Sequence, residues 1–395
     1  MKKSLFTKIL CVMVAVASTF LFTGCGDKGI KVPGFDKTAN IKIGVSGPLT
    51  GGAAIYGQAV NNGAKLAVKE INDNGGLDGL MFSFEMYDDQ HDASKVPTNY
   101  YAMAEAGMQI SLGCVTSTPC LEFKSLAVED NMFIMTPSAT ADKVYENASN
   151  VYQMCFSDNG QGTASATYVA QNYATAKVGV FYKVDDAYSK GIFDNFKASY
   201  AGNWADVVVT EFTKDTALDF SAQVAQLAAC DFVFMPIYYE DASLFMTQAQ
   251  NKIANTAVFF GCDGFDGITA LEGFDVNTIK QEISYLSHFD ASATTGKTGE
   301  FIANYNKVFK PSSLNQFGAS AYDCVYAIFE ALKVAKANGK TFSGSTSASD
   351  MCNILTEVLQ NGTFTFNGVT GTNIKWNADG TVNKAPVKYV VKSAS

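Results

Sequence analysis

The sequence contains no arginine, because all 29 of its basic residues are lysines. Charged residues make up only 17% of the chain, below the roughly 25% of an average soluble protein. Without a guanidinium group, the protein cannot grip a carboxylate or a phosphate through a bidentate pair of hydrogen bonds. The net charge of −9 also argues against binding to nucleic-acid phosphates. We therefore exclude nucleic acid as a partner, although codon bias towards lysine is an alternative explanation of the composition itself.

Recognisable catalytic motifs are also missing. The two histidines, His91 and His288, lie far apart, and no CxxC pair accompanies them, so zinc-ligand spacing is absent. No glycine-rich dinucleotide motif, phosphate-binding loop or GxSxG nucleophile turn is present. A hydrolase with Asp263 or Asp88 as its base stays the weakest alternative, because neither has a clear nucleophile beside it. We predict a protein that is not an enzyme and that needs no cofactor or metal.

The first 24 residues have the pattern of a secretory signal peptide. Lysines at positions 2, 3 and 8 flank an apolar stretch, Ile9–Phe22, which is too short to cross a bilayer comfortably. The stretch ends in Leu21-Phe22-Thr23-Gly24-Cys25, which looks like a lipobox of bacterial lipoproteins, although Phe22 stands where Leu or Val is usual. We predict removal of residues 1–24, lipidation of Cys25 and a tether over 25–39. The alternatives are an ordinary signal peptide with an incidental cysteine, or a membrane anchor.

The cysteines do not form an obvious disulfide framework. Besides Cys11 and Cys25, seven remain, and an odd number cannot all pair. Cys114 and Cys120 are close enough in sequence to close a short loop, but buried free thiols are the favoured interpretation for most of the seven.

Short β-type runs alternate with helical stretches, a pattern that predicts an α/β fold with parallel sheets. One group of strands ends before about residue 150 and another begins near 178, which indicates two similar lobes. The predicted strands are 41–45, 81–87, 109–112, 133–136, 178–182, 207–210, 232–235, 257–260, 283–286, 363–366, 373–376 and 386–392. The last of them follows several helices and fits a chain that crosses back between the lobes.

Hydroxyl-bearing loops follow three strands of the first group. They are Ser46–Tyr56, Gly113–Thr118 and Thr136–Thr140. In open α/β sheets, ligands bind beyond the carboxyl ends of the strands. Hydroxyl groups and the free N–H groups of helix N-termini bind a carboxylate without help from a cation, which matters in a chain that has no arginine.

Loops of the second group supply different chemistry. They are Asp185–Tyr188, Ile237–Glu240 and Gly261–Gly264, and they bring tyrosines and carboxylates. Such groups suit an ammonium ion and an aliphatic side chain. For each residue alone, a helix cap or core packing is the ordinary explanation, so the inference depends on their joint placement.

At this point the chain resembles a family, the substrate-binding lipoproteins of branched-chain amino acid ABC transporters, which have the type I periplasmic-binding-protein fold. The resemblance runs from about Ile41 to Val391. It is carried by the order and spacing of several short motifs: Ser46-Gly47-Pro48-Leu49-Thr50-Gly51, Tyr56-Gly57, Asn74-Gly75-Gly76, Tyr87-Asp88-Asp89, Thr136-Pro137-Ser138-Ala139-Thr140, Asp158 with Gln161-Gly162, Tyr188-Ser189-Lys190-Gly191 and Ala321-Tyr322-Asp323.

The resemblance implies two Rossmann-like lobes joined by a hinge of three crossovers. We place lobe 1 at 40–157 plus 287–372 and lobe 2 at 158–286 plus 373–395. By position, Ser117, Ser138 and Thr140 are expected to hold an α-carboxylate and to help with the amino group. Asp263 is expected to take the α-ammonium, where the family commonly has the longer Glu. The tyrosines expected to line the side-chain and closure surfaces are Tyr56, Tyr188, Tyr238 and Tyr322.

The resemblance further implies capture of a neutral amino acid, with branched-chain ones favoured, and its delivery to the permease subunits of an ABC transporter. The protein is then expected to be a monomer, outside the cytoplasm, and lipid-anchored to the outer face of the bacterial cell membrane. The competing hypothesis is a ligand-sensing receptor module of the same fold that takes no part in transport.

Overall fold

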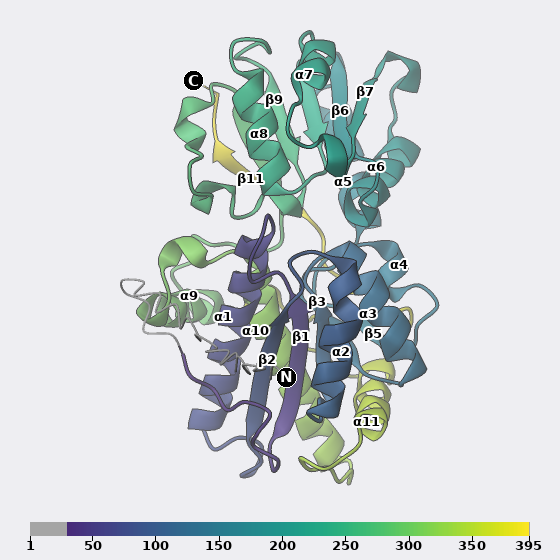
Figure 1. Cartoon of the computed structure of the whole chain (residues 1–395), viewed down its shortest axis with the longest axis vertical. Helices are drawn as coiled ribbons and strands as arrows, with labels where there is room; N and C mark the ends of the chain where they lie inside the picture. Colours follow the sequence, from purple (N-terminus) through teal and green to yellow (C-terminus); the bar gives the residue numbers. More distant parts are fainter. Residues whose placement is uncertain (1–29, 395) are drawn as a thin grey trace, which may run out of the picture.

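The computed structural model describes residues 30–394, so the predicted signal peptide and lipidated Cys25 lie outside the described residues. Two α/β lobes lie one above the other along the long axis of the molecule (Figure 1). The first contains a sheet of five parallel strands in the order β2-β1-β3-β4-β5. These strands are β1 (Ile41–Gly47), β2 (Phe82–Asp88), β3 (Ile110–Cys114), β4 (Ile134–Thr136) and β5 (Val151–Gln153). All seven residues of β1 are buried, as expected for a central parallel strand covered on both faces.

The second lobe contains a six-stranded sheet in the order β11-β10-β9-β8-β6-β7. Its strands are β6 (Val178–Lys183), β7 (Val208–Phe212), β8 (Phe232–Met235), β9 (Val258–Gly261), β10 (Glu282–Ser287) and β11 (Val387–Lys392). The first five are parallel, whereas β11 pairs antiparallel with β10 at the edge of the sheet. The predicted α/β fold with two parallel-sheet lobes is therefore confirmed.

Helices cover both sheets. In the first lobe they are α1 (Ala54–Asp73), α2 (Val96–Glu105), α3 (Ser117–Glu129), α4 (Asp142–Tyr145), α9 (Gly296–Val308), α10 (Gln316–Ala337) and α11 (Ala348–Gln360). In the second they are α5 (Asp158–Asn172), α6 (Ala187–Ser199), α7 (Ser221–Leu227) and α8 (Tyr239–Ala249). Helices α9, α10 and α11 lie in sequence between β10 and β11 of the second sheet, yet they pack on the first lobe (Figure 1).

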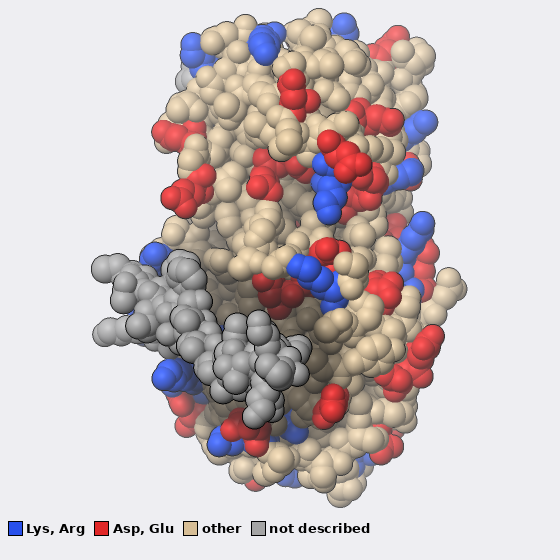
Figure 2. Space-filling view, in the orientation of Figure 1, with Lys and Arg blue, Asp and Glu red and all other residues tan. Residues whose placement is uncertain are grey.

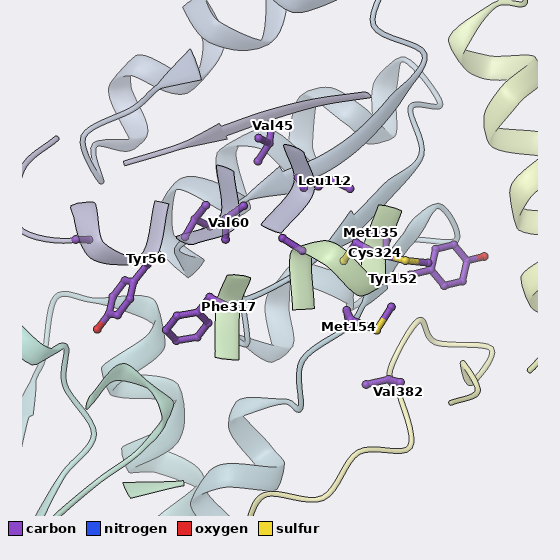
Figure 3. Close-up of a cluster of buried hydrophobic side chains, with 14 of the residues drawn as sticks. Val45, Tyr56, Val60, Leu112, Met135, Tyr152, Met154, Phe317, Cys324 and Val382 are labelled. Atoms are coloured by element: carbon purple, nitrogen blue, oxygen red, sulfur yellow. The ribbon is translucent and has the colours of Figure 1, made fainter. Parts of the chain in front are cut away.

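The core of the first lobe joins early and late segments of the chain. Val45 and Leu112 from the sheet pack with Val60 of α1 and Cys324 of α10 in one buried cluster (Figure 3). Helices α1 and α10 approach closely at two glycines, because a Cβ on Gly63 would lie 1.9 Å from the carbonyl oxygen of Gly318. This packing fixes the start of α1 and the start of α10 at the boundary between the lobes.

The segment after α11 differs from the prediction. Strands were expected at 363–366 and 373–376, but these residues form only isolated bridges, Phe366 with Ile374 and Trp376 with Val382. The indole of Trp376 donates to the carbonyl oxygen of Gln153, and the amide of Gln153 donates to the carbonyl oxygen of Gly380. The lobe boundaries stay a prediction, and these bonds to β5 favour a final crossover after Val382 rather than at 373.

The seven cysteines outside the leader are all buried free thiols, as the favoured interpretation expected. Burial raises the pKa of the Cys114 thiol well above its usual value, with Cys120 beside it as a further cause. Within residues 30–394, no helix has the length and apolar character that a bilayer crossing requires.

Candidate ligand-binding site

A small cavity lies between the two lobes, and its free volume of about 10 Å³ is roughly the space that one water molecule needs. Both lobes contribute to its lining, which consists of Tyr56, Val115, Thr116, Ser138, Tyr188, Tyr238, Asp263, Gly264 and Phe317. The first-lobe residues come from loops and helix starts that follow β1, β3 and β4, and from the start of α10. The second-lobe residues follow β8 and β9 or begin α6. The cavity therefore lies beyond the carboxyl ends of the strands, where this architecture places ligands.

One end of the cavity is formed by the N-terminus of α3. Thr116 is the N-cap residue, but its side chain does not cap the helix, because its hydroxyl bonds to Nδ1 of His91 at 2.8 Å. The backbone N–H groups of Ser117 and Thr118 in the first turn have no intrahelical acceptor. The helix dipole adds a partial positive charge at this point. This end is therefore suited to an anion, although none of the nine lining residues is a cation.

Three predicted hydroxyl residues lie at or beside this end, all of them buried. Ser138 lines the cavity, and its hydroxyl donates to the carbonyl oxygen of Val115 at 2.6 Å. The Ser138 hydroxyl can therefore only accept a hydrogen bond from a ligand. Ser117 accepts the Ala141 amide at 3.2 Å and keeps its own proton for donation. Thr140, two residues after Ser138, has a hydroxyl with no partner. Ser117 and Thr140 lie next to lining residues rather than in the lining itself.

On the second-lobe side, the lining carries Asp263, whose side chain is almost completely buried, at 1% exposure. Its Oδ1 accepts a hydrogen bond from the Tyr188 hydroxyl at 2.8 Å, and its Oδ2 has no partner. Burial raises the pKa of the Asp263 carboxyl to about 7, while the bond from Tyr188 lowers it. The backbone N–H of Asp263 is held by Oε1 of Gln161 at 2.9 Å. A buried, half-partnered carboxylate is suited to a cationic donor.

Aromatic rings form the walls between the two ends. Tyr188 and Tyr238 are stacked, with their ring centroids 4.6 Å apart. Tyr56 packs edge-on against Phe317 at 4.8 Å and against Tyr238 at 5.5 Å. The Tyr56 hydroxyl also donates to the carbonyl oxygen of Gly264 at 2.5 Å, which joins lobe 1 to lobe 2. These rings offer an apolar surface for a side chain, and the bond shows that the lobes are closed on one another.

Tyr322 is the one predicted site residue that lies elsewhere. Its hydroxyl donates to Oε2 of Glu70 at 2.6 Å, and it lines a second cavity beside α1, α9 and α10. Phe317, 1.4 turns earlier on α10, occupies the ligand cavity instead. Sequence reasoning missed Phe317, and also Val115, Thr116 and Gly264. No local motif marks Phe317, whose position follows only from the packing of α10 on α1, whereas the other three lie in loops that the sequence analysis had singled out.

On the part of the surface that Figure 2 shows in colour, lysines lie singly among acidic side chains. Acidic side chains also gather on this face near the boundary between the lobes.

Comparison with known proteins agrees with this geometry. A family model described as periplasmic binding protein matches residues 40–393. The Leu/Ile/Val-binding protein of Rhizobium johnstonii is 31% identical over 245 residues, 61% of this chain. The chain spans 65% of the length of that relative.

Two solved structures have the same fold. A leucine-binding protein from Thermotoga maritima has a TM-score of 0.75 and 23% identity, over 90% of this chain and 96% of that one. A branched-chain amino acid transporter substrate-binding protein from Streptococcus pneumoniae, solved with isoleucine, has a TM-score of 0.73 and 25% identity, over 89% and 95% of the two chains.

Proposed function

Because this chain belongs to the periplasmic binding protein family, we propose that it captures a neutral amino acid, with branched-chain ones favoured, in the cavity between its lobes. The free Oδ2 of Asp263 is the observation that carries the proposal. It lies in a cavity whose other end is the N-terminus of α3, so the two ends are suited to the ammonium and the carboxylate of one zwitterion. The aromatic walls leave room for an uncharged side chain rather than a second charge.

In this proposal, Ser117, Ser138 and Thr140 lie around the carboxylate, together with the N–H groups of α3. Tyr188 orients Asp263, while Tyr56, Tyr238 and Phe317 contact the side chain. Tyr322 is left out of the ligand set, because it is hydrogen-bonded to Glu70. No arginine is needed, and a ligand with a second anionic group is disfavoured because no cation lines the cavity.

We further propose that the protein works outside the cytoplasm, anchored through a lipid on Cys25 and tethered by residues 25–39, and that it delivers the amino acid to an ABC permease. The motif around Cys25 supports the anchor. The Leu/Ile/Val-binding relative and the isoleucine bound in the Streptococcus pneumoniae structure support the ligand class. Globomycin treatment of expressing cells, which blocks lipoprotein signal peptidase, tests the anchor: accumulation of the longer precursor is expected, and unaltered processing contradicts it.

A thermal-shift screen tests the ligand. The protein is unfolded, dialysed to remove any bound ligand and refolded, and its melting temperature is measured with each of the twenty amino acids. A ligand at a hundred times its Kd stabilises the folded state by about 2.7 kcal/mol, which shifts the melting temperature by several degrees. We expect leucine, isoleucine or valine to give this shift. No shift with any neutral amino acid contradicts the proposed function.

A further inference from the structure

Asp158 is a second buried carboxylate that the proposed ligand site has not used. It is the first residue of α5, and its side chain is completely buried. Neither of its carboxylate oxygens has a hydrogen-bond partner. The carboxylate lies against Gly191 of α6, where an added Cβ would be 2.5 Å from Oδ2 of Asp158. A buried carboxylate without donors is costly, so this side chain requires an explanation.

The position of Asp158 links it to both sides of the proposed site, through Thr140 beside the expected carboxylate position and through Gln161 to Asp263. Its backbone N–H donates to the carbonyl oxygen of Thr140 at 2.9 Å. Gln161, three residues later on the same face of α5, holds the backbone of Asp263. On α6, Gly191 contacts Asp158 and Tyr188 bonds to Asp263, again three residues apart. The first turns of α5 and α6 therefore connect the two carboxylates.

Unsatisfied polar atoms gather around this connection. Besides the two oxygens of Asp158, they are Oδ2 of Asp263, the hydroxyl of Thr140 and Nε2 of Gln161. The three acceptor oxygens belong to carboxyl groups, and the two donors are neutral groups. Burial raises the pKa of the Asp158 carboxyl well above its usual value, although the nearby Thr140 hydroxyl lowers it, and the charges of Asp142, Asp263 and Asp186 raise it further.

Two lysine side chains near this region are already paired. Lys190 on α6 bonds to Asp194 at 2.6 Å, and Lys183 lies 3.5 Å from Asp241. Within residues 30–394 no group of three His, Cys, Asp or Glu side chains has the arrangement of a metal site. The missing positive charge is therefore best supplied by the ligand itself.

We propose that Asp158 is a specificity-determining residue of the proposed amino acid site. It acts through Thr140 and Gln161, together with Asp263, to favour ligands that carry an ammonium group and to reject the carboxylic acid of the same skeleton. This inference rests on the proposed function. Its physical reason is that a carboxylic acid ligand adds a negative charge beside two buried carboxyl groups, whereas an ammonium group offsets them. Sites built for a polar ligand group discriminate strongly against analogues that lack it.

The test compares leucine with 4-methylpentanoate, which is leucine without its amino group. Affinities for both are measured by calorimetry on refolded wild-type protein and on Asp158→Asn. We expect Asp158→Asn to weaken leucine binding and to strengthen 4-methylpentanoate binding, so that the ratio of the two affinities falls by about tenfold or more. Asp158→Glu, which keeps the charge, should recover part of the wild-type ratio.

A matched control is Asp194→Asn, which removes an exposed carboxylate from α6 without touching the buried pair. This variant should keep the ratio of the two affinities within about twofold of the wild-type value, because exposed charges are screened by water and salt. Gly191→Ala is a second route if Asp158→Asn fails to fold. The added Cβ must displace the Asp158 carboxylate, although the substitution removes no charged group. The ratio of leucine affinity to 4-methylpentanoate affinity should again fall.

The outcomes separate the two proposals. If wild-type protein binds neither leucine nor another neutral amino acid, the proposed function is contradicted. If wild-type protein binds leucine but the ratio of leucine affinity to 4-methylpentanoate affinity is unchanged in the variants, the specificity role of Asp158 is contradicted. An equal fall of both affinities contradicts it too, and Asp158 then has only a structural role.

Discussion

At the residue scale, the proposed function depends most on Asp263. Its carboxylate is buried, bonded on one oxygen by Tyr188 and free on the other. The sequence predicted this residue for the ammonium group, but only through family resemblance, because one aspartate after a strand is an ordinary feature. The contact with Tyr188 joins the loop after β9 to the start of α6, which follows β6, and no local pattern reveals it.

Replacing Asp263 by Asn tests its role in binding. A ligand ammonium then loses its charged acceptor in a buried site, so leucine affinity should fall by about a hundredfold, since losing one partner of a buried charged pair costs roughly 2–5 kcal/mol. Calorimetry measures the affinity, and Asp290→Asn, at an exposed aspartate, is the control. An unchanged affinity in Asp263→Asn contradicts the assignment.

The same variant has a predicted effect on stability in the absence of ligand. The pKa of Asp263 is about 7 in the folded protein and near its ordinary value of 3.8 when unfolded. The folded state therefore binds more protons between these values, and the free energy of unfolding falls as the pH rises from about 4 to 7. Above pH 7, Asp263→Asn should be more stable than wild type by on the order of 3–4 kcal/mol. Urea unfolding at pH 5 and pH 8 measures the difference, which should shrink at pH 5. Equal differences at both pH values contradict the raised pKa.

At the element scale, the N-terminus of α3 is expected to hold the ligand carboxylate. The sequence analysis predicted a hydroxyl-rich loop, Gly113–Thr118, after a buried strand, and α3 begins within this loop at Ser117. Ser117→Ala removes a hydroxyl that is free to donate, and it should weaken leucine binding by roughly 1–2 kcal/mol, the usual effect of losing a hydrogen bond to a charged group. Binding of 3-methylbutylamine, which lacks the carboxylate, should not change. Equal losses for the two ligands would indicate a general disturbance of the loop instead.

The packing of α1 on α10 positions Tyr56 and Phe317 in the cavity. Gly63→Ala would place a Cβ 1.9 Å from the carbonyl oxygen of Gly318, so the helices must separate. We expect a loss of about 1–3 kcal/mol, the typical cost of overpacking, and a lower melting temperature. Gly160→Ala in α5 is the control, because its Cβ would meet its nearest atom at 3.6 Å and alanine favours helix. An undisturbed melting temperature in Gly63→Ala contradicts the close approach of the helices.

Other elements show where sequence patterns fail. Strand β8 was predicted with its observed bounds, because Phe232–Met235 is a short apolar run between helices. Strand β5 was missed, since three residues give too little periodicity. The predicted strands at 363–366 and 373–376 became isolated bridges, because their apolar residues pack on the first-lobe core instead of extending a sheet. A local pattern of apolar residues predicts that a segment is buried. It does not predict which part of the fold the segment packs against.

At the scale of the whole molecule, the two lobes are closed over the cavity. Tyr56 donates to Gly264, the Ile55 amide donates to the Tyr239 hydroxyl at 3.3 Å, and Thr118 donates to Asp186 at 2.8 Å. Each of these bonds joins one lobe to the other. A cavity of about 10 Å³ that the two lobes cover in this way cannot admit an amino acid unless the lobes move apart. Entry of ligand therefore requires a hinge motion over the connecting segments.

Small-angle scattering tests this motion. Ligand-free protein should populate an open form with a larger radius of gyration than the leucine complex, because the ligand favours the closed state that it contacts with both lobes. Thr118→Val removes two hydrogen bonds between the lobes, to Asp186 and from the Ala187 amide, and should increase the open population without ligand. The hinge is contradicted if the radius of gyration is the same with and without saturating leucine.

The most direct measurement of the central claim is a crystal structure of the refolded protein with leucine. We expect the leucine ammonium to lie within hydrogen-bonding distance of Oδ2 of Asp263, with the carboxylate at the N-terminus of α3 and the side chain between Tyr56, Tyr238 and Phe317. Leucine bound in the reverse orientation, or bound outside the cavity between the lobes, would contradict the claim.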